Sequence, residues 1–344
     1  MLSFRLRSAL ERAVIGQHRA VQTILRTVTV ALGGLGNRET PLGVYLLVGP
    51  SGTGKTHLAC SLARLLHGST RRLMVVDCIQ LTERDGWPAI ARQISPHFRF
   101  PTAGQDSVLS MAPLSILLVE HLEAARPQVV QALVNSLETG LWMLPEGKCG
   151  TLRGSIVLMT SKLCSREIFE AGRQEMGFSP ATPDLEETEK ARIYQLCVNA
   201  AEKQWGSDFL AHLDDLVVFH RLRASSLPAI LDRLLLELNQ QLSARQVTCH
   251  LDPAAVQFLS ERSSHYLRHG AWMLGKLFRR FVVFPVADLL SSGRVRAGSR
   301  VLVELDEAER LRFQVEPPAE HAEAERAEVG AAVRVPVEWD ETLV

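Results

Sequence analysis

The octapeptide Gly49-Pro50-Ser51-Gly52-Thr53-Gly54-Lys55-Thr56 decides the fold of this chain. It follows the apolar run VYLLV at 44–48, and it precedes a helical pattern of apolar residues over 57–66. Glycines let a backbone curl so that several N–H groups face one anion, and a helix N-terminus adds a partial positive charge. The order of strand, glycine-rich loop and helix therefore predicts a loop that binds the phosphates of a nucleoside triphosphate.

Two residues of this loop predict particular contacts with such a ligand. Lys55 is expected to neutralise the β- and γ-phosphate oxygens, and the hydroxyl of Thr56 is expected to bind Mg²⁺. The remaining loop residues would surround the phosphates with their backbone, and they are Pro50, Ser51, Gly52, Thr53 and Gly54. Binding and hydrolysis are separate questions, because hydrolysis needs further groups that act on the bound phosphate.

The composition is that of a globular protein, with 46% apolar and 22% charged residues in a chain of 344, long enough for two domains. Lys plus Arg and Asp plus Glu both number 38, so the balance of charge does not favour nucleic acid or an anionic membrane as partner. The six cysteines form no CxxC pair, so neither a zinc site nor a redox pair is predicted. Without a secretory leader or a membrane-spanning apolar run, we expect a cytoplasmic protein with reduced thiols.

Short apolar runs alternate with helical patterns over the first two thirds of the chain. Strands are predicted at 44–48, 73–77, 114–120, 156–161 and 216–219, and helices at 2–33 with a break at Gly16, 57–66, 78–95 and 127–138. This alternation predicts an α/β fold, with a parallel sheet covered by helices on both faces. The charged stretch 165–190 contains two glycines and two prolines, and it is predicted to be a surface insertion or mobile loop.

After Leu222 the pattern changes to long helices with a few short strands. Helices are predicted at 227–245, 253–262 and 270–290, and strands at 247–251, 300–305 and 311–315. The chain is therefore divided into a large α/β nucleotide-binding subdomain, a small helical subdomain and a tail, at 1–222, 223–316 and 317–344. The tail is rich in Glu, Ala and Pro and lacks periodicity, which predicts disorder.

Several motifs, in this order, resemble the AAA+ module of the Clp/ClpB-type unfoldases, in particular the second ATPase module of ClpB, ClpC and ClpV. The matching stretches are Val14–Gln17, Pro41–Val44, Gly49–Thr56, Glu123–Pro127, Met159–Ser161, Leu216–His220, Gly270-Ala271 and Pro285. The resemblance extends over about residues 10–316. It implies an AAA+ P-loop NTPase fold with a lid-like small subdomain, and a chain that consists of one module without the family's N-terminal domain.

The resemblance also implies cofactors and partners. ATP with Mg²⁺ would bind between the two subdomains, with the adenine near Ile15 and Gly16. Copies of the chain would form a homo-oligomeric ring, usually a hexamer, or join a hetero-ring, with each site at a subunit boundary. An aromatic loop would grip a polypeptide client in the pore. An activating protein is a further expected partner, whereas a membrane or a nucleic acid is not expected.

The end of the third strand departs from the family pattern. The family has Asp-Glu where this chain has Glu120-His121, so Glu120 is expected to hold Mg²⁺ and His121 takes the position of the water-polarising base. A neutral imidazole can accept a proton. Three interpretations stay open: His121 acts as the base, Glu123 replaces it, or His121 is a surface residue of a site without a base.

Three more positions differ from the family. Lys162 stands where an Asn is expected, and it either contacts the γ-phosphate as a point charge or is solvated. His212 takes the place of the trans-acting arginine, whose role neutral His cannot fill. Trp272 takes the place of a nucleotide-sensing arginine and is expected to contact the nucleotide. Arg268 and Lys276, one helical turn away, either compensate in part for the missing cation or do not, and both alternatives stay open. The pattern predicts slow ATP hydrolysis, or a pseudo-ATPase that acts as a nucleotide-stabilised scaffold.

Two short segments bear on protein partners. Phe98-Arg99-Phe100 lies near the family's aromatic pore loop, and it either grips a client or anchors the loop to a core. Met176-Gly177-Phe178 lies where some relatives carry a tripeptide that docks on a peptidase ring, and the other interpretation is ordinary turn packing. A DNA-loading function is disfavoured by the balanced charge.

Overall fold

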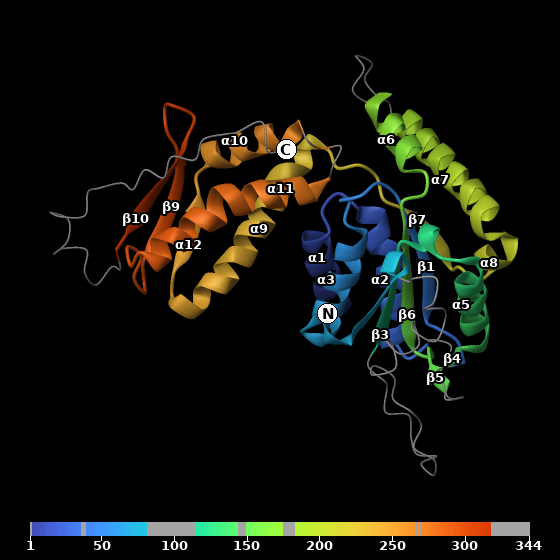
Figure 1. Ribbon diagram of the computed structural model, residues 1–344. Helices are drawn as coiled ribbons and strands as arrows, with labels where there is room; N and C mark the ends of the chain where they lie inside the picture. Colours follow the sequence, from blue (N-terminus) through green and yellow to red (C-terminus); the bar gives the residue numbers. More distant parts are fainter. Residues whose placement is uncertain are drawn as a thin grey trace, which may run out of the picture. The chain divides into compact units, whose positions relative to one another are not determined.

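A computed structural model of the chain describes residues 2–35, 39–80, 114–143, 149–174, 183–265, 267 and 270–317. The chain divides into two compact units, Met1–Arg221 (unit 1) and Leu222–Val344 (unit 2), whose elements are labelled in Figure 1. The glycine-rich loop belongs to unit 1.

Unit 1 is organised around a five-stranded parallel sheet with the order β2-β3-β6-β1-β7. Its strands are β1 (Gly43–Val48), β2 (Leu73–Asp77), β3 (Ser115–Glu120), β6 (Ser155–Ser161) and β7 (Asp215–Val218). The register pairs Asp77 with Glu120 and Val48 with Ser161, so the carboxyl ends of β1, β2, β3 and β6 lie along one edge. The predicted parallel sheet is confirmed.

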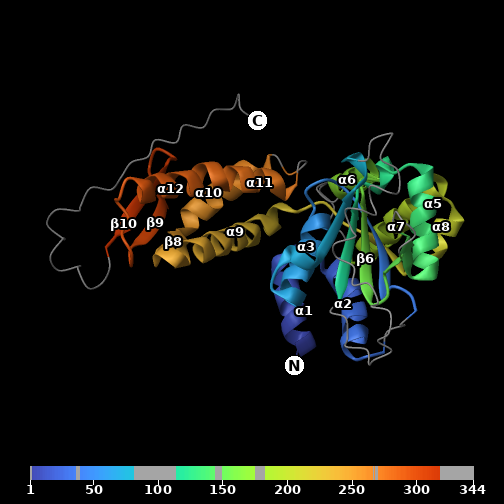
Figure 2. The same ribbon diagram turned by 60° about the horizontal axis from the view of Figure 1, so that its bottom comes forward.

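Helices cover both faces of this sheet (Figure 2). One face carries α1 (Leu2–Ala13), α2 (His18–Leu32) and α3 (Lys55–His67), and the other carries α5 (Pro127–Thr139), α6 (Ser165–Gln174), α7 (Pro183–Trp205) and α8 (Ser207–Ala211). Tyr45 and Leu47 pack into the first core, whereas Leu46 and Val48 pack into the second. Because successive side chains of β1 point to opposite covered faces, the strand is a continuous apolar run.

Two parts of unit 1 differ from what the sequence predicts. The stretch 165–190 is not simply a loop, because α6 begins at Ser165 and α7 begins at Pro183. The buried side chain of Ile168 joins α6 to the core while charged residues face outward, and charge density alone does not reveal that arrangement. An antiparallel hairpin, β4 (Leu141–Met143) with β5 (Cys149–Thr151), was not predicted, since strands of three residues carry too short a pattern.

Unit 2 is mostly helical, as predicted. Its main helices are α9 (Leu227–Leu242), α10 (Pro253–Ser264), α11 (Ala271–Phe278) and α12 (Phe284–Ser291). A π-helical turn, η9 (Arg279–Val283), joins α11 to α12. The small sheet has the order β10-β9-β8, formed by β8 (Thr248–Leu251), β9 (Arg300–Leu305) and β10 (Leu311–Glu316), with β8 and β9 parallel.

Short 3-10 helices complete the described elements: η1 (Thr70–Arg72), η2 (Cys78–Gln80), η4 (Leu122–Ala124), η6 (Ala224–Ser226) and η7 (Ser243–Arg245). Several predictions fall outside the described residues, namely most of the helix at 78–95, the segment Phe98–Phe100, the tripeptide Met176–Phe178 and residues 318–344 of the tail. Among the helices that are described, none has the length and apolar character needed to cross a bilayer.

Candidate nucleotide-binding site

The glycine-rich loop connects β1 to α3, and its backbone conformation requires glycine. Gly49, Gly52 and Gly54 have φ angles of 143°, 73° and 105°. A Cβ atom on Gly49 would lie 2.4 Å from the backbone oxygen of Phe219, at the end of β7. The chain can therefore leave the sheet at this point only with glycine, since any side chain would collide with backbone.

The side chain of Lys55 curls back into the loop from the first turn of α3. Its Nζ donates hydrogen bonds to the backbone oxygens of Gly49 at 2.6 Å and Pro50 at 2.7 Å. Burial lowers the pKa of the Lys55 ammonium to about 8; the carboxylate of Glu123 opposes this shift and Lys162 adds to it. A cation held inside a curl of backbone N–H groups is suited to phosphate oxygens.

A buried glutamine ties the loop to the rest of the sheet. Gln17 is 3% exposed, and its Nε2 donates to the backbone oxygens of Thr53 at 3.3 Å and His220 at 2.8 Å. Its Oε1 accepts from the backbone N–H of His220 at 3.2 Å. Thr53 in turn donates its hydroxyl to the oxygen of Pro50 at 2.8 Å. Gln17 was not predicted as a site residue, although it ends the stretch Val14–Gln17 that carried the family resemblance.

Ile15 and Gly16 lie just before Gln17, in the turn between α1 and α2. Ile15 is half-buried, and Gly16 is exposed with a φ of 78°. The amide of Gln17 thus joins the segment that contains these two residues to the loop and to the end of β7. Their contact with an adenine ring stays a prediction.

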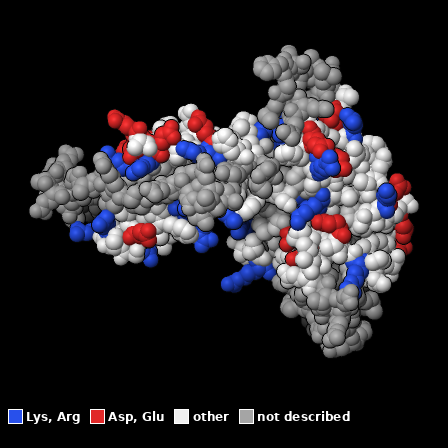
Figure 3. Space-filling view, turned by 45° about the horizontal axis from the view of Figure 1, so that its top comes forward, with Lys and Arg blue, Asp and Glu red and all other residues white. Residues whose placement is uncertain are grey.

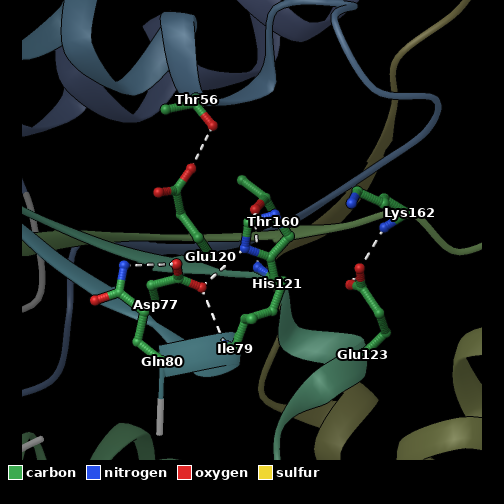
Figure 4. Close-up of polar contacts among 9 residues, drawn as sticks. All are labelled: Thr56, Asp77, Ile79, Gln80, Glu120, His121, Glu123, Thr160 and Lys162. Carbon is green, nitrogen blue, oxygen red and sulfur yellow. Dashed lines mark hydrogen bonds and ion pairs between the residues drawn. The ribbon is translucent and has the colours of Figure 1, made fainter.

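Thr56 and Glu120 form the candidate metal site. The hydroxyl of Thr56 donates to Oε1 of Glu120 at 2.5 Å, which joins α3 to the end of β3 (Figure 4). Both residues present oxygen atoms, the ligand type that Mg²⁺ prefers, so the residues fit this ion. No group of three or more His, Cys, Asp or Glu suited to a metal occurs among the described residues. Mg²⁺ would therefore take its remaining ligands from nucleotide phosphates and water.

His121 lies directly after β3, and its side chain contacts the neighbouring strand. Its Nδ1 is 2.9 Å from Oδ1 of Asp77, the last residue of β2, and its backbone N–H donates to the hydroxyl of Thr160 at 3.3 Å. The imidazole is 28% exposed and the Asp77 side chain 21%. Asp77 was not predicted as a site residue, although it is the only carboxylate in the predicted strand 73–77.

Glu123 and Lys162 also reach this edge of the sheet. Glu123 lies on η4, and its Oε2 accepts a hydrogen bond from the backbone N–H of Lys162 at 3.2 Å (Figure 4). Lys162 follows β6 and is exposed. The structure thus brings Glu120, His121 and Glu123 to the carboxyl edge of the sheet, together with the two phosphate-loop residues Lys55 and Thr56.

The other two altered positions lie elsewhere. His212 caps the C-terminus of α8 and is half-buried. Trp272 belongs to α11 of unit 2, where its side chain is 44% exposed and the Nζ of Lys276 lies 4.2 Å from the centroid of its ring. Arg268 lies outside the described residues. A role of Trp272 at the nucleotide stays a prediction.

Comparison with known proteins gives consistent matches along the chain. Residues 40–215 match the family described as "AAA domain (Cdc48 subfamily)", and residues 222–303 match the "C-terminal, D2-small domain, of ClpB protein". The chain is 28% identical to the chaperone protein ClpB of Agrobacterium fabrum over 328 residues, covering 94% of this chain and 36% of the relative. It is 26% identical to ClpB of Bacillus anthracis over 306 residues, covering 89% and 34%.

A solved structure shares the fold. The closed state of Hsp104 with ATPγS and FITC casein matches with a TM-score of 0.69 and 23% identity, covering 90% of this chain and 51% of that chain. The chain spans about a third of the length of the curated relatives that it matches.

Proposed function

The chain belongs to the AAA domain family, Cdc48 subfamily, and on this premise we propose that it binds ATP with Mg²⁺ and hydrolyses it slowly to remodel or assemble other proteins. Its unit 2 matches the small domain of ClpB. The family resemblance predicted from the sequence motifs is confirmed by these matches. The binding site, the rate and the partners are part of the proposal.

The placement of Lys55 carries the proposal of ATP binding. Its ammonium lies inside the glycine-rich loop against the oxygens of Gly49 and Pro50, and a bound triphosphate would offer it oxygens with a full negative charge instead. The first turn of α3 would add its N–H groups to the same phosphates. Thr56 and Glu120, already 2.5 Å apart, would supply oxygen ligands or water contacts to Mg²⁺.

The proposal of slow hydrolysis is supported by the residues that stand at three positions where the family carries catalytic groups. At the base position, His121 offers one neutral nitrogen in place of a charged carboxylate with two oxygens. Lys162 can donate to phosphate but cannot accept a hydrogen bond from water. His212 lacks the permanent charge of an arginine, which stabilises the charge that develops on a transferred phosphoryl group. Each change lowers the rate and leaves the phosphate loop intact.

The proposed partners are copies of the chain in a ring, a hetero-ring, and a polypeptide client. The curated relatives are chaperones by name, and the matching Hsp104 structure contains casein, itself a protein. On the face shown in Figure 3, Lys and Arg side chains are interspersed with Asp and Glu, a surface suited to protein contacts more than to a phosphate backbone. We therefore propose a protein client.

One observation favours the alternative of a nucleotide-stabilised scaffold. The Nζ of Lys276 lies 4.2 Å from the centroid of the exposed ring of Trp272, the residue that takes the place of the family's arginine, and a cation is attracted to the face of such a ring. If neither Lys276 nor another cation reaches the phosphates, nucleotide binding would order the chain without turnover. The scaffold would then bind other proteins in an ATP-dependent conformation.

Three measurements on the same preparation test the proposal. With ATP and Mg²⁺, we expect an increase in melting temperature, since ATP binds the native state, and an increase in mass by light scattering. ATP turnover is expected to be low but measurable and to disappear in Lys55→Met. No thermal shift with saturating ATP and Mg²⁺ would contradict ATP binding. A shift without turnover favours the scaffold, whereas turnover above about 0.1 per second, already well below ordinary enzyme rates, excludes it.

A further inference from the structure

We propose that residues 338–341 of this chain dock on a stripe of exposed aromatic and basic side chains in unit 2 of the same chain. The stripe consists of Trp272, Lys276, Arg279 and Phe284, and the docking segment is Glu338-Trp339-Asp340-Glu341. This docking is separate from the proposed binding and hydrolysis of ATP, and it is tested without nucleotide.

Three successive helical elements carry the stripe. The helix α11, the π-helical turn η9 and the helix α12 follow one another without an intervening residue (Figure 1). Trp272 and Lys276 are four positions apart in α11, and Arg279 follows Lys276 after three, so these side chains are neighbours on one face. The wider turn of a π-helix brings Phe284, five positions after Arg279, next to the guanidinium. The structure thus arranges the four side chains in one row.

Each aromatic ring of the stripe has a cation beside it. The Nζ of Lys276 lies 4.2 Å from the ring centroid of Trp272, and the guanidinium carbon of Arg279 lies 5.4 Å from that of Phe284. The side chains of Trp272 and Phe284 are 44% and 50% exposed, and both cations are exposed as well. The stripe is therefore surface on which apolar rings and positive charges alternate.

The two cations of the stripe have no carboxylate partner in the part of the chain that the structure describes. Other basic side chains of unit 2 do have one. Arg233 of α9 pairs with Glu237 at 2.6 Å, and Arg262 of α10 pairs with Glu309 at 3.2 Å. Because opposite charges and apolar surfaces complement one another, the stripe fits an acidic segment that also carries an aromatic residue.

The sequence contains such a segment in residues 318–344, which lie outside the described residues. These residues include seven acidic and two basic side chains. Four of the acidic residues fall in 320–328, where no Phe, Tyr or Trp occurs. The other three are Glu338, Asp340 and Glu341, and they surround Trp339. Only 338–341 therefore combines the carboxylates and the ring that complement the stripe.

The covalent connection favours docking within one chain. Glu338 is 21 positions after Pro317, the last described residue, and an extended stretch of that length spans up to about 70 Å. A compact unit of about 100 residues has a radius of gyration of about 13 Å, so the segment can reach any face of unit 2. A linker of this kind gives an effective concentration of about 1 mM, at which a contact with a Kd of about 0.1 mM is about 90% occupied.

Single-stranded nucleic acid is the other class of ligand that basic and aromatic side chains bind together. Its binding grooves track a backbone with a phosphate at every nucleotide, whereas the stripe supplies two cations. The whole chain has 38 basic and 38 acidic residues, without an excess of positive charge. These observations favour the acidic segment, and nucleic acid enters the tests as a competitor.

The first test is cross-linking of the full chain with a carbodiimide, which joins a carboxylate directly to a lysine amine. Unlabelled and ¹⁵N-labelled chains are mixed in equal amounts, and the linked peptides are identified by mass spectrometry. We expect Lys276 to be linked to Glu338, Asp340 or Glu341, with pairs of the same label at least about tenfold more abundant than mixed pairs. The control Lys276→Arg keeps the positive charge and should lose the cross-link.

The second test reads the environment of Trp339 by fluorine NMR of the full chain labelled with fluorotryptophan. The signal, assigned by its loss in Trp339→Phe, should differ from that of a free peptide of residues 333–344. Reversing both cations, in Lys276→Glu with Arg279→Glu, should move it to the position of the free peptide, as should 0.5 M NaCl. The matched control, Arg245→Glu with Arg294→Glu, reverses two exposed arginines elsewhere in unit 2 and should leave the signal in place.

An exchange of charges between the two surfaces separates docking from damage to the fold. The triple variant Glu338→Lys, Asp340→Lys and Glu341→Lys should by itself release Trp339. Combined with the reversed stripe, it should restore at least about half of the shift, because the opposite charges face each other again. Melting temperatures show that each variant is folded. Folded variants in which the exchange restores nothing would contradict the contact between these charges.

Four further outcomes overturn the proposal. A Trp339 signal that matches the free peptide in the unmodified chain shows that the segment is not docked. Cross-links of Lys276 to 320–328 in place of 338–341 assign the stripe to other residues. Mixed-label pairs as abundant as same-label pairs place the segment on a second copy. Release of Trp339 by an equimolar twelve-nucleotide single-stranded DNA assigns the stripe to nucleic acid. Same-label cross-links together with a restored signal after charge exchange support the proposal.

Discussion

The hydroxyl of Thr56 donates a hydrogen bond to Oε1 of Glu120 at 2.5 Å, which joins the first turn of α3 to the carboxyl end of β3. The two residues are 64 positions apart in the sequence. Their contact brings the oxygen atoms expected to serve Mg²⁺ together at the phosphate loop.

The first prediction concerns this pair. We expect Thr56→Ala to weaken ATP binding about tenfold in the presence of Mg²⁺ and to leave ATP binding in EDTA nearly unchanged. The reason is that the variant loses only the part of the binding free energy that depends on the metal. Calorimetric titrations with and without Mg²⁺ measure the difference. The control is Thr29→Ala, whose hydroxyl donates to the backbone oxygen of Leu25 within α2. Equal losses with and without Mg²⁺ would contradict a role of Thr56 at the metal.

The second prediction concerns the lowered pKa of Lys55. In the free chain this pKa is about 8, and phosphate oxygens favour the charged ammonium, so ATP binding should raise it. ATP binding should therefore be accompanied by the uptake of a proton by Lys55, at pH values where Lys55 is neutral in the free chain and charged in the complex. ATP affinity should fall as pH rises above about 8, after correction for the nucleotide's own ionisation.

Calorimetry in two buffers of different ionisation enthalpy measures this uptake. Near pH 8.5 the ATP-binding enthalpies observed in the two buffers should differ by a fraction of the difference between the buffers' ionisation enthalpies. Near pH 6.5 the part of this difference that comes from Lys55 should vanish, because Lys55 is already charged in the free chain. Lys55→Met should remove the difference, although its weaker binding requires more nucleotide. An unmodified chain without uptake near pH 8.5 would place Lys55 away from the phosphates.

The third prediction concerns Gln17. Gln17→Ala removes the hydrogen bonds between this buried side chain and the backbone of Thr53 and His220, and we expect a loss of about 2 kcal/mol in the free energy of unfolding. ATP affinity should fall too, because the loop loses its tie to β7. Urea denaturation and ATP titration give both values. The control, exposed Gln195→Ala, should change stability by less than about 0.5 kcal/mol.

The fourth prediction compares two glycines. Gly49→Ala places a Cβ 2.4 Å from the oxygen of Phe219, and we expect a loss of about 3 kcal/mol or more in stability. Gly275, inside α11, has nothing within 4 Å of its added Cβ. Gly275→Ala should therefore stabilise unit 2 by about 0.5–1 kcal/mol through helix propensity. Denaturant titrations measure the free energy of unfolding of both variants. An unchanged stability in Gly49→Ala would contradict the close approach of Gly49 to the backbone of Phe219.

The fifth prediction restores two groups at once. His121→Glu returns a charged carboxylate to the base position, and His212→Arg returns a permanent cation. In the double variant we expect ATP turnover to rise at least about tenfold, since one arginine alone can be worth orders of magnitude in such reactions. The assay is steady-state phosphate release, with folding checked by melting temperature. Unchanged turnover in a folded double variant would contradict the explanation of slow hydrolysis.

Much of the fold was predictable because its signals are local. Strand β2 begins and ends where the apolar run at 73–77 does, and Gly16 breaks the N-terminal helix with a φ of 78°. The extent of α6 could not be predicted, because its ten residues are largely polar and only a few of them, Ile168 above all, join the core. Whether such a segment is helix or loop depends on the surface that it can pack against.

By itself, the sequence determined the parallel sheet, the phosphate loop and the identity of Lys55, Thr56 and Glu120 as candidate ligands. Each of these features depends on residues that are adjacent in the sequence, because buried strands are apolar and a curled loop needs glycine. Only the tertiary structure decided that His121 meets Asp77, 44 positions away, and that Gln17 meets His220, 203 positions away. Strand register and helix packing set these pairs, because hydrogen bonds between distant segments leave no local pattern in the chain.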